Sequence, residues 1–258
     1  MPTADSPLSG VRVLVTRPAA QATTLMNLVR AAGGEPVPFP TLVIEPVAPD
    51  NVAIQRLRES DTVIFVSANA AACGYPLLHD LDGPARHVLA VGRATRRKLE
   101  QMGCRDVYTP ESGRGTSEEL LASPPLEDVS GHRVCIVRGE GGRGTLKHEL
   151  VSRGARVSYV ECYRRRPAAP DPAILDRALD APEGSLLISI TSVTGLARLL
   201  ELAPAGRKPG LLARPLVVIG GRQKAAALEY GWKGLVLEAG AGDEEIVATL
   251  AGWRELTP

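Results

Sequence analysis

An internal repeat constrains the fold of this 258-residue chain more than any other feature. The stretch GVRVLVTRPAAQATTLMNLVRAAGGEPV, within 10–40, follows the same template as GHRVCIVRGEGGRGTLKHELVSRGARVS, within 131–163, and Arg17 falls on Arg138 at 121 positions' distance. The match extends to three further pairs of segments: 62–71 with 186–195, 87–104 with 215–232, and 116–122 with 242–248. The chain therefore consists of two copies of a four-unit half.

Each unit begins with a short apolar run, continues through a polar or glycine turn and ends in an amphipathic stretch with apolar residues three and four apart. The apolar runs are VRVLV, TVIFV, VLAV, VCIV, LLISI and LVVI. Runs that are apolar throughout are expected of strands covered on both faces of a parallel sheet. The pattern predicts α/β architecture with two doubly wound, flavodoxin-like parallel-sheet lobes.

Two proline-punctuated segments, 38–50 and 159–172, break this rhythm and mark crossings between lobes. These crossings are compatible with two lobes that follow one another in the sequence, or with two lobes of which one is discontinuous in the sequence. We favour the discontinuous arrangement, because each crossing follows the apolar strand after an opening β–α unit. The predicted domains are a first lobe of 1–39 and 168–258, a second lobe of 51–157, and a two-stranded hinge of 40–50 and 158–167.

Composition narrows the function classes. The chain is 44% apolar and 23% charged, as globular chains are, but only 3% aromatic, which disfavours stacking of single-stranded nucleic acid. The net charge is +1, so no global field attracts polyanions. The start, MPTADSPLSG, has no leader pattern, and no apolar run approaches ~18 residues. We expect a soluble, cytoplasmic protein that binds neither nucleic acid nor membrane.

Cysteine and histidine spacings give no sign of metal. No two cysteines approach a C-x-x-C spacing, and no two histidines stand four residues apart. We expect free thiols in a reducing compartment and no metal site.

The turns that follow the strands carry the candidate chemistry. Parallel sheets bind ligands beyond the carboxyl ends of their strands, where helix N-termini attract anions. Serine, threonine and glycine at such turns also serve as helix caps, but the arginines are not needed for capping. The candidate substrate-binding residues are Thr16, Arg17, Ser67, Ala68, Asn69, Gly92, Arg93, Thr95, Ser117, Arg138, Gly139, Glu140, Arg143, Thr191, Ser192, Gly220, Gly221 and Arg222.

Residues 131–166 hold nine basic and three acidic side chains, which indicates either a solvated basic face or anion capture. Within them GEGGRG, from Gly139 to Gly144, satisfies G-x-G-x-x-G after a strand, and Glu161 ends the next strand as a ribose-binding acid would. A dinucleotide-dependent oxidoreductase is therefore one alternative. A non-enzymatic, two-lobed anion-binding protein is another.

Several motifs together resemble the uroporphyrinogen-III synthase family. They are R-G-E-G-G-R-x-x-L followed by G-A-x-V and C-Y-R-R between Arg138 and Arg165, S-A-N-A at Ser67, V-G-x-x-T at 91–95, T-S-E-E-L at 116–120 and I-T-S at 190–192. The resemblance covers the whole chain in order. At one position it departs from the family pattern, because Gln223 stands where the family commonly has threonine.

The resemblance implies a lyase of porphyrin, tetrapyrrole and heme biosynthesis that needs no cofactor. Such an enzyme converts hydroxymethylbilane, a linear tetrapyrrole with eight carboxylates, to uroporphyrinogen III by loss of water and inversion of ring D between the lobes. The tyrosine of the family's Y-R motif falls on Tyr163 and is the implied catalytic acid. We expect a monomer whose one further partner, in transient contact, is the enzyme that supplies the bilane.

Overall fold

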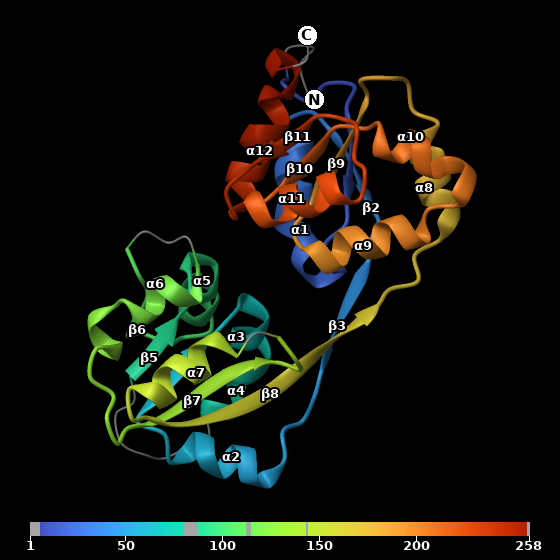
Figure 1. Ribbon diagram of the computed structural model, residues 1–258. Coiled ribbons are helices and arrows are strands. Elements are labelled where there is room, and N and C mark those ends of the chain that lie inside the picture. Colours follow the sequence, from blue (N-terminus) through green and yellow to red (C-terminus); the bar gives the residue numbers. More distant parts are fainter. Residues whose placement is uncertain (1–5, 80–86, 112–114, 143, 257–258) are drawn as a thin grey trace. The chain divides into compact units, whose positions relative to one another are not determined.

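The computed structural model describes residues 6–79, 87–111, 115–142 and 144–256 (Figure 1). The chain divides into two compact units. Unit 1 contains Met1–Val43 and Arg166–Pro258, and unit 2 contains Ile44–Arg165. No helix in the described ranges is long and apolar enough to cross a membrane.

Unit 1 is a five-stranded parallel sheet with helices between its strands. Its strands are β1 (Arg12–Val15), β2 (Glu35–Pro38), β9 (Leu186–Ile190), β10 (Leu216–Val218) and β11 (Val236–Glu238). Its helices are α1 (Ala19–Ala31), α8 (Pro172–Leu179), α9 (Val193–Leu202), α10 (Lys208–Leu212), α11 (Gly221–Glu229) and α12 (Asp243–Gly252), with short 3-10 turns at Ala205–Arg207 and Trp253–Leu256.

Unit 2 is built around a six-stranded sheet. Its strands are β3 (Leu42–Pro46), β4 (Thr62–Phe65), β5 (His87–Ala90), β6 (Val107–Tyr108), β7 (Arg133–Gly139) and β8 (Arg156–Pro167). Its helices are α2 (Asn51–Arg58), α3 (Ala68–Gly74), α4 (Pro76–His79), α5 (Arg93–Gln101), α6 (Ser117–Leu121) and α7 (Thr145–Ser152), with a 3-10 turn η1 at Pro124–Leu126. All six apolar runs singled out in the sequence form strands.

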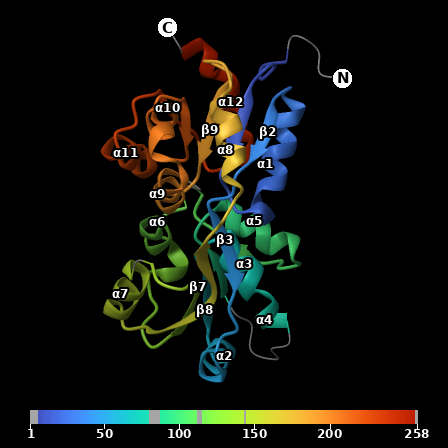
Figure 2. The same cartoon turned by 90° about the vertical axis from the view of Figure 1, so that its right-hand side faces the viewer.

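Alternation along the strands gives each sheet two buried faces. In unit 1, Val13 and Leu187 pack beneath α1 and α12, whereas Leu14 and Ile188 pack beneath α8, α9 and α11. In unit 2, Val63 lies under α3 and α5, and its neighbour Ile64 lies under α6 and α7. Figure 2 shows helices on both sides of each sheet. The doubly wound α/β prediction is confirmed.

The strand orders explain the sequence repeat. Unit 1 has the order β2-β1-β9-β10-β11, and unit 2, beyond its edge strand β3, has β8-β7-β4-β5-β6. Both become the flavodoxin order 2-1-3-4-5 when β7, the repeat of β1, is counted as the first strand of unit 2. The second unit is therefore a circular permutation of the first. The order reverses between β1 and β9 in unit 1 and between β7 and β4 in unit 2.

Strands β3 and β8 lie side by side where the chain changes units. The Val47 amide donates to the Cys162 carbonyl over 3.0 Å, and the Ala168 amide donates to the Thr41 carbonyl over 3.0 Å. The two pairs run in opposite chain directions, so these strands are antiparallel. Arg164 on β8 adds two 2.8 Å contacts to the carboxylate of Glu45 on β3, which raises the pKa of Arg164.

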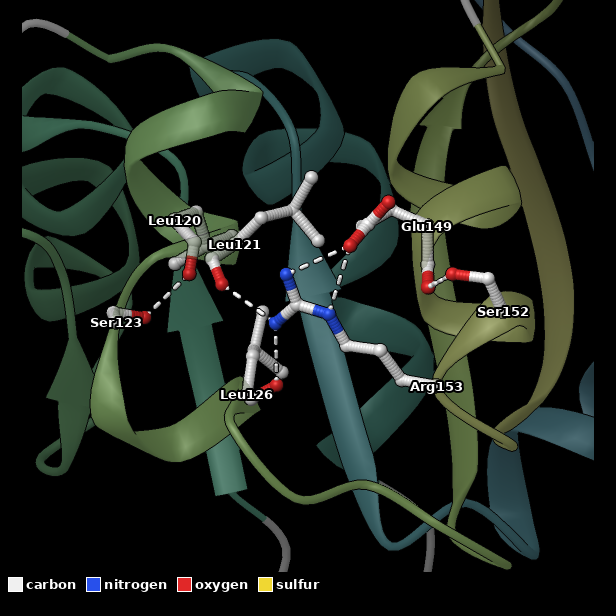
Figure 3. A network of polar contacts seen from close by, with 7 residues as sticks. All are labelled: Leu120, Leu121, Ser123, Leu126, Glu149, Ser152 and Arg153. Atoms are coloured by element: carbon white, nitrogen blue, oxygen red, sulfur yellow. Dashed lines mark hydrogen bonds and ion pairs between the residues drawn. The ribbon is translucent and has the colours of Figure 1, made fainter.

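One arginine joins three helical segments of unit 2 (Figure 3). Arg153, after α7, donates to the carbonyls of Leu121 and Leu126 over 2.7 and 2.8 Å, and to the carboxylate of Glu149 over 2.9 Å. The two carbonyls belong to the end of α6 and to η1, where helix geometry leaves acceptors without partners. Arg153 thereby fixes α6 and η1 against α7.

Candidate active site

Four predicted site residues of unit 2 lie at the ends of β4 and β7, the two strands between which the strand order reverses. Ser67 follows β4, Arg138 and Gly139 are the last two residues of β7, and Glu140 follows it. Because β4 and β7 are parallel neighbours, their carboxyl ends share one edge of the sheet. Tyr163 reaches the same edge from β8, where a register shift pairs it with Gly139. The fold therefore brings together segments 96 residues apart.

The Tyr163 hydroxyl is the centre of a short polar chain. Its oxygen lies 3.1 Å from Ser67 Oγ and accepts a hydrogen bond from Arg165 Nη2 over 3.0 Å. The ring is 1% exposed and packs among core residues of unit 2, including Phe65 and Val137. The phenol is therefore held between a hydroxyl and a guanidinium.

Gly139 makes room for that ring. A Cβ added to Gly139 would lie 2.5 Å from Cε2 of Tyr163 and 2.6 Å from its Cζ, far inside contact distance. The backbone beside it is tied as well, because the Glu140 amide donates to the Tyr163 carbonyl over 2.8 Å. The glycine predicted as a binding residue is therefore needed to seat the tyrosine.

Strand alternation selects one of the three arginines that follow Tyr163. Side chains two apart share a face of a strand, so Arg165 lies on the tyrosine's side, with its guanidinium 5.3 Å from the ring centroid. Arg164 points the other way, to Glu45. The period of two along 163–165 is the signal in the sequence that distinguishes Arg165.

Ser67 has a second role as the N-cap of α3. Its Oγ accepts a hydrogen bond from the Ala70 amide over 3.1 Å. Ala68 and Asn69, its predicted neighbours in the site, are the first two residues of α3 and are partly exposed.

Arg138 is buried rather than extended from the turn. Its side chain is 10% exposed, and its guanidinium lies 4.7 Å from the ring centroid of Tyr159, which also carries Lys147 at 5.0 Å. Its Nε donates to the Gly139 carbonyl over 3.2 Å and lies 3.9 Å from Glu161. Glu161, the acid considered for ribose, thus faces an arginine. Arg143 lies outside the described residues.

The remaining predicted residues of unit 2 have mixed positions. Gly92 caps α5, and Arg93, which is exposed, donates to the Glu111 carbonyl over 2.9 Å. Thr95 is 4% exposed, inside the helix packing rather than at the turn. Ser117 begins α6, whose cap is Thr116.

In unit 1, Thr16 and Arg17 follow β1, one of the two strands between which the strand order reverses. Thr16 is buried, and its hydroxyl donates to the Ser189 carbonyl over 2.7 Å. Arg17 forms an ion pair with Asp243 at the start of α12. Thr41, which the sequence analysis did not single out, donates to the Thr16 carbonyl over 3.3 Å.

The other unit 1 turns are helix starts. Ser192 caps α9 by accepting from the Gly195 amide over 3.0 Å, and Thr191 beside it is partly exposed. Gly220 caps α11 with a φ of 139°, a value that favours glycine, while Gly221 and Arg222 are exposed.

The thiols lie in apolar surroundings. Burial raises the pKa of Cys135 to about 11 and that of Cys162, next to Tyr163 in sequence, to about 12. All four cysteines are free. Within the described ranges no three His, Cys, Asp or Glu side chains gather in a way that could hold a metal ion.

The two units, one a circular permutation of the other, place polar turns at the carboxyl ends of their parallel strands and define a two-unit, flavodoxin-like α/β protein. The chain belongs to the uroporphyrinogen-III synthase family, because the family model described as uroporphyrinogen-III synthase HemD matches residues 23–248. Neither the oxidoreductase nor the non-enzymatic alternative finds support.

Similar proteins agree with this assignment. Uroporphyrinogen-III synthase from Salmonella typhimurium is 32% identical over 92% of this chain and 99% of its own length, and that from Escherichia coli is 30% identical over 92% and 99%. Among solved structures, a mutant uroporphyrinogen III synthase from Thermus thermophilus has a TM-score of 0.60 at 22% identity, covering 95% of this chain and 98% of its own. The uroporphyrinogen-III synthetase from Helicobacter pylori has a TM-score of 0.59 at 16% identity, covering 95% and 100%. These two likenesses concern the fold.

Proposed function

We propose that this chain is a lyase that closes hydroxymethylbilane, a linear tetrapyrrole, to uroporphyrinogen III, with loss of water and inversion of ring D. Membership of the uroporphyrinogen-III synthase family supports the reaction class. The observation that carries the assignment of the site is the contact of the Tyr163 hydroxyl with Ser67 Oγ at 3.1 Å, at the carboxyl edge of the unit 2 sheet.

The chemistry needs one proton and control of substrate shape. The electron-rich pyrroles expel the terminal hydroxyl as water once it is protonated. Tyr163 is the source of that proton, and the Arg165 guanidinium, which donates to its oxygen, lies beside the negative charge left behind. An unassisted bilane closes to the uninverted type I isomer, so the protein must hold ring D so that its substituted carbon attacks.

The substrate's eight carboxylates are the reason to assign binding to the turns. The family resemblance and the placement of Ser67, Ser192 and Gly220 at helix starts support this assignment. The proposed binding residues are Thr16, Arg17, Ser67, Ala68, Asn69, Gly92, Arg93, Thr95, Ser117, Arg138, Gly139, Glu140, Arg143, Thr191, Ser192, Gly220, Gly221 and Arg222.

The proposal includes a cytoplasmic monomer that works without a cofactor and receives its substrate through transient contact with the enzyme that supplies the bilane. The near-neutral net charge of +1 is consistent with a small-molecule ligand rather than a polyanion.

The deciding experiment is an isomer analysis. The purified chain is incubated with hydroxymethylbilane, the products are oxidised, and the type I and type III porphyrins are separated by chromatography. We expect predominantly type III product, against type I from heat-inactivated protein. Type I product alone from folded protein would reject the proposal.

A further inference from the structure

The burial of Tyr163 conflicts with direct delivery of its proton to a substrate. The residue is 1% exposed, its ring fills the space above Gly139, and Arg165 covers its oxygen. Ser67, whose Oγ lies 3.1 Å from that oxygen, is partly exposed. A substrate at this edge of unit 2 therefore meets the serine hydroxyl before the phenol.

The hydrogen-bond donors restrict which way the chain can run. A guanidinium only donates, so the Tyr163 oxygen is the acceptor in its contact with Arg165. Either hydroxyl can be the donor between Tyr163 and Ser67 Oγ, which is the other partner of this phenol among the described residues. When the phenol donates, Ser67 Oγ accepts both from Tyr163 and from the Ala70 amide. With both its lone pairs engaged, the serine then has its own proton left to donate outward.

We propose that Ser67 hands the proton to the departing hydroxyl and is reprotonated at once by Tyr163, with Arg165 as the positioning residue of the relay. This inference rests on the proposed function and specifies the path of its proton.

The relay balances over one turnover. Ser67 Oγ–H protonates the terminal hydroxyl, the carbon–oxygen bond breaks, and its electron pair leaves with water. The Tyr163 proton moves to Ser67 Oγ, and the phenolate remains beside the Arg165 guanidinium. The pyrrole carbon that forms the final ring bond later loses its hydrogen as a proton, which returns through Ser67 to the phenolate. Loss of water is the net change, and both side chains are regenerated.

Substitutions at Ser67 can separate this role from helix capping. Threonine keeps both the hydroxyl and the cap, asparagine keeps the cap without a hydroxyl that can relay, and alanine loses both. We expect Ser67→Thr to retain kcat within about threefold, and Ser67→Asn and Ser67→Ala each to lose about 10²-fold, the lower end for general acid catalysis because the leaving group is labile. Only Ser67→Ala should lower the thermal midpoint.

Asp50→Ala is the matched control for capping. Asp50 caps α2 by accepting from the Ala53 amide over 2.7 Å and is exposed. Its loss should lower the midpoint as Ser67→Ala does, with turnover unchanged. Full activity of Ser67→Asn would overturn the relay.

A double-mutant cycle tests whether the two hydroxyls act as one unit. We expect Tyr163→Phe to lose about 10²-fold in kcat, and Ser67→Asn combined with Tyr163→Phe to lose no more than the worse single variant. If the double variant instead lost about 10⁴-fold in kcat, the product of the two single losses, the residues would act independently and the proposal would be overturned.

The test of Arg165 must distinguish a positioning role in the relay from a role in substrate binding. Arg165→Met should lower kcat about tenfold with KM unchanged, should be partly rescued by Arg165→Lys, and should have no further effect in a Tyr163→Phe background. A raised KM that persists in that background would assign Arg165 to substrate binding instead. Arg156→Met, at the far end of β8, is the charge-matched control and should leave kcat unchanged.

Failure of the relay differs from failure of the proposed function. If the wild-type chain yields only type I product, the function is wrong whatever the variants do. If the wild type yields type III and Ser67→Asn does so at the same rate, the function stands and the relay is wrong. Variants that are slowed should still form type III, because the shape of the bound bilane does not depend on the proton path.

Discussion

At the scale of single residues, neighbours determine what a charged side chain does. From the sequence, Arg138 is predicted to bind an anion at a turn. In the structure its guanidinium packs over the Tyr159 ring, and its Nε donates to the Gly139 carbonyl. Arg165, two residues beyond Tyr163, is the arginine that contacts the phenol. One ion pair at the other end of the unit 2 sheet offers a test of how such contacts affect stability.

Asp61 gives the folded protein an acid-dependent contribution to stability. Hydrogen bonds from Arg133 lower the pKa of Asp61 from 3.8 to about 2, so the contribution is complete above the unfolded value of about 3.9 and is lost as pH falls through about 2. We expect Asp61→Asn to be less stable than wild type near pH 5, with the difference shrinking between pH 4 and 2. Both side chains are over one third exposed, so the difference should be small.

Urea unfolding of both proteins at several pH values between 2 and 6 measures this difference. Free energies of unfolding that run parallel over the whole range would contradict the assignment of the pKa to this pair.

At the scale of helices and strands, residues close together in the sequence determine where the turns lie. A few long side chains fix the helices against one another. Ser67, Thr116 and Ser192 cap helices directly after strands, as their residue types predict. The hydrogen bonds of Arg153 cannot be predicted from nearby residues, because their acceptors, the carbonyls of Leu121 and Leu126, lie 32 and 27 residues away in the sequence (Figure 3).

Replacement of Arg153 by lysine should therefore destabilise the protein although the charge is kept. The planar guanidinium of arginine reaches two carbonyls and a carboxylate at once, which the single ammonium of lysine cannot do. The carbonyls of Leu121 and Leu126 would therefore lose their hydrogen-bond donor. We expect a loss of about 1–3 kcal/mol in the free energy of unfolding, measured by denaturant titration. Arg96→Lys is the control, because Arg96 pairs with Glu100 at helical spacing on an exposed surface. An equal effect of both substitutions would contradict the role given to Arg153.

At the scale of the whole molecule, each unit has its own core. The four hydrophobic clusters formed by described residues each draw their members from one unit alone, two clusters to a unit. Burial of apolar side chains within each unit therefore supplies its core.

A cavity in one core should loosen that unit and spare the other. Leu187 and Ile64 are both fully buried, in units 1 and 2 respectively. We expect Leu187→Ala to cost about 2–5 kcal/mol and to raise amide hydrogen exchange in the strands of unit 1, with Ile64→Ala showing the reverse pattern. Mass spectrometry of exchanged peptides measures this. Equal increases in both units for either variant would show that the two cores unfold together.

The six strands formed by the apolar runs, their parallel arrangement and the turns after them could be predicted from the sequence, because apolar periodicity and cap residues act over a few positions. The 121-residue repeat also indicated two related lobes. The family resemblance, carried by motifs such as Y-R at Tyr163, was confirmed by the comparisons.

Only the tertiary structure decided which side chains meet. The contact of Tyr163 with Ser67 spans 96 residues and exists because β8, β7 and β4 are neighbours in a permuted strand order. Arg138 and Arg165 are both basic residues at the ends of neighbouring strands. Arg138 is buried against the Tyr159 ring, whereas Arg165 contacts the Tyr163 hydroxyl. Packing between distant segments sets these positions, and no pattern within a short window contains that information.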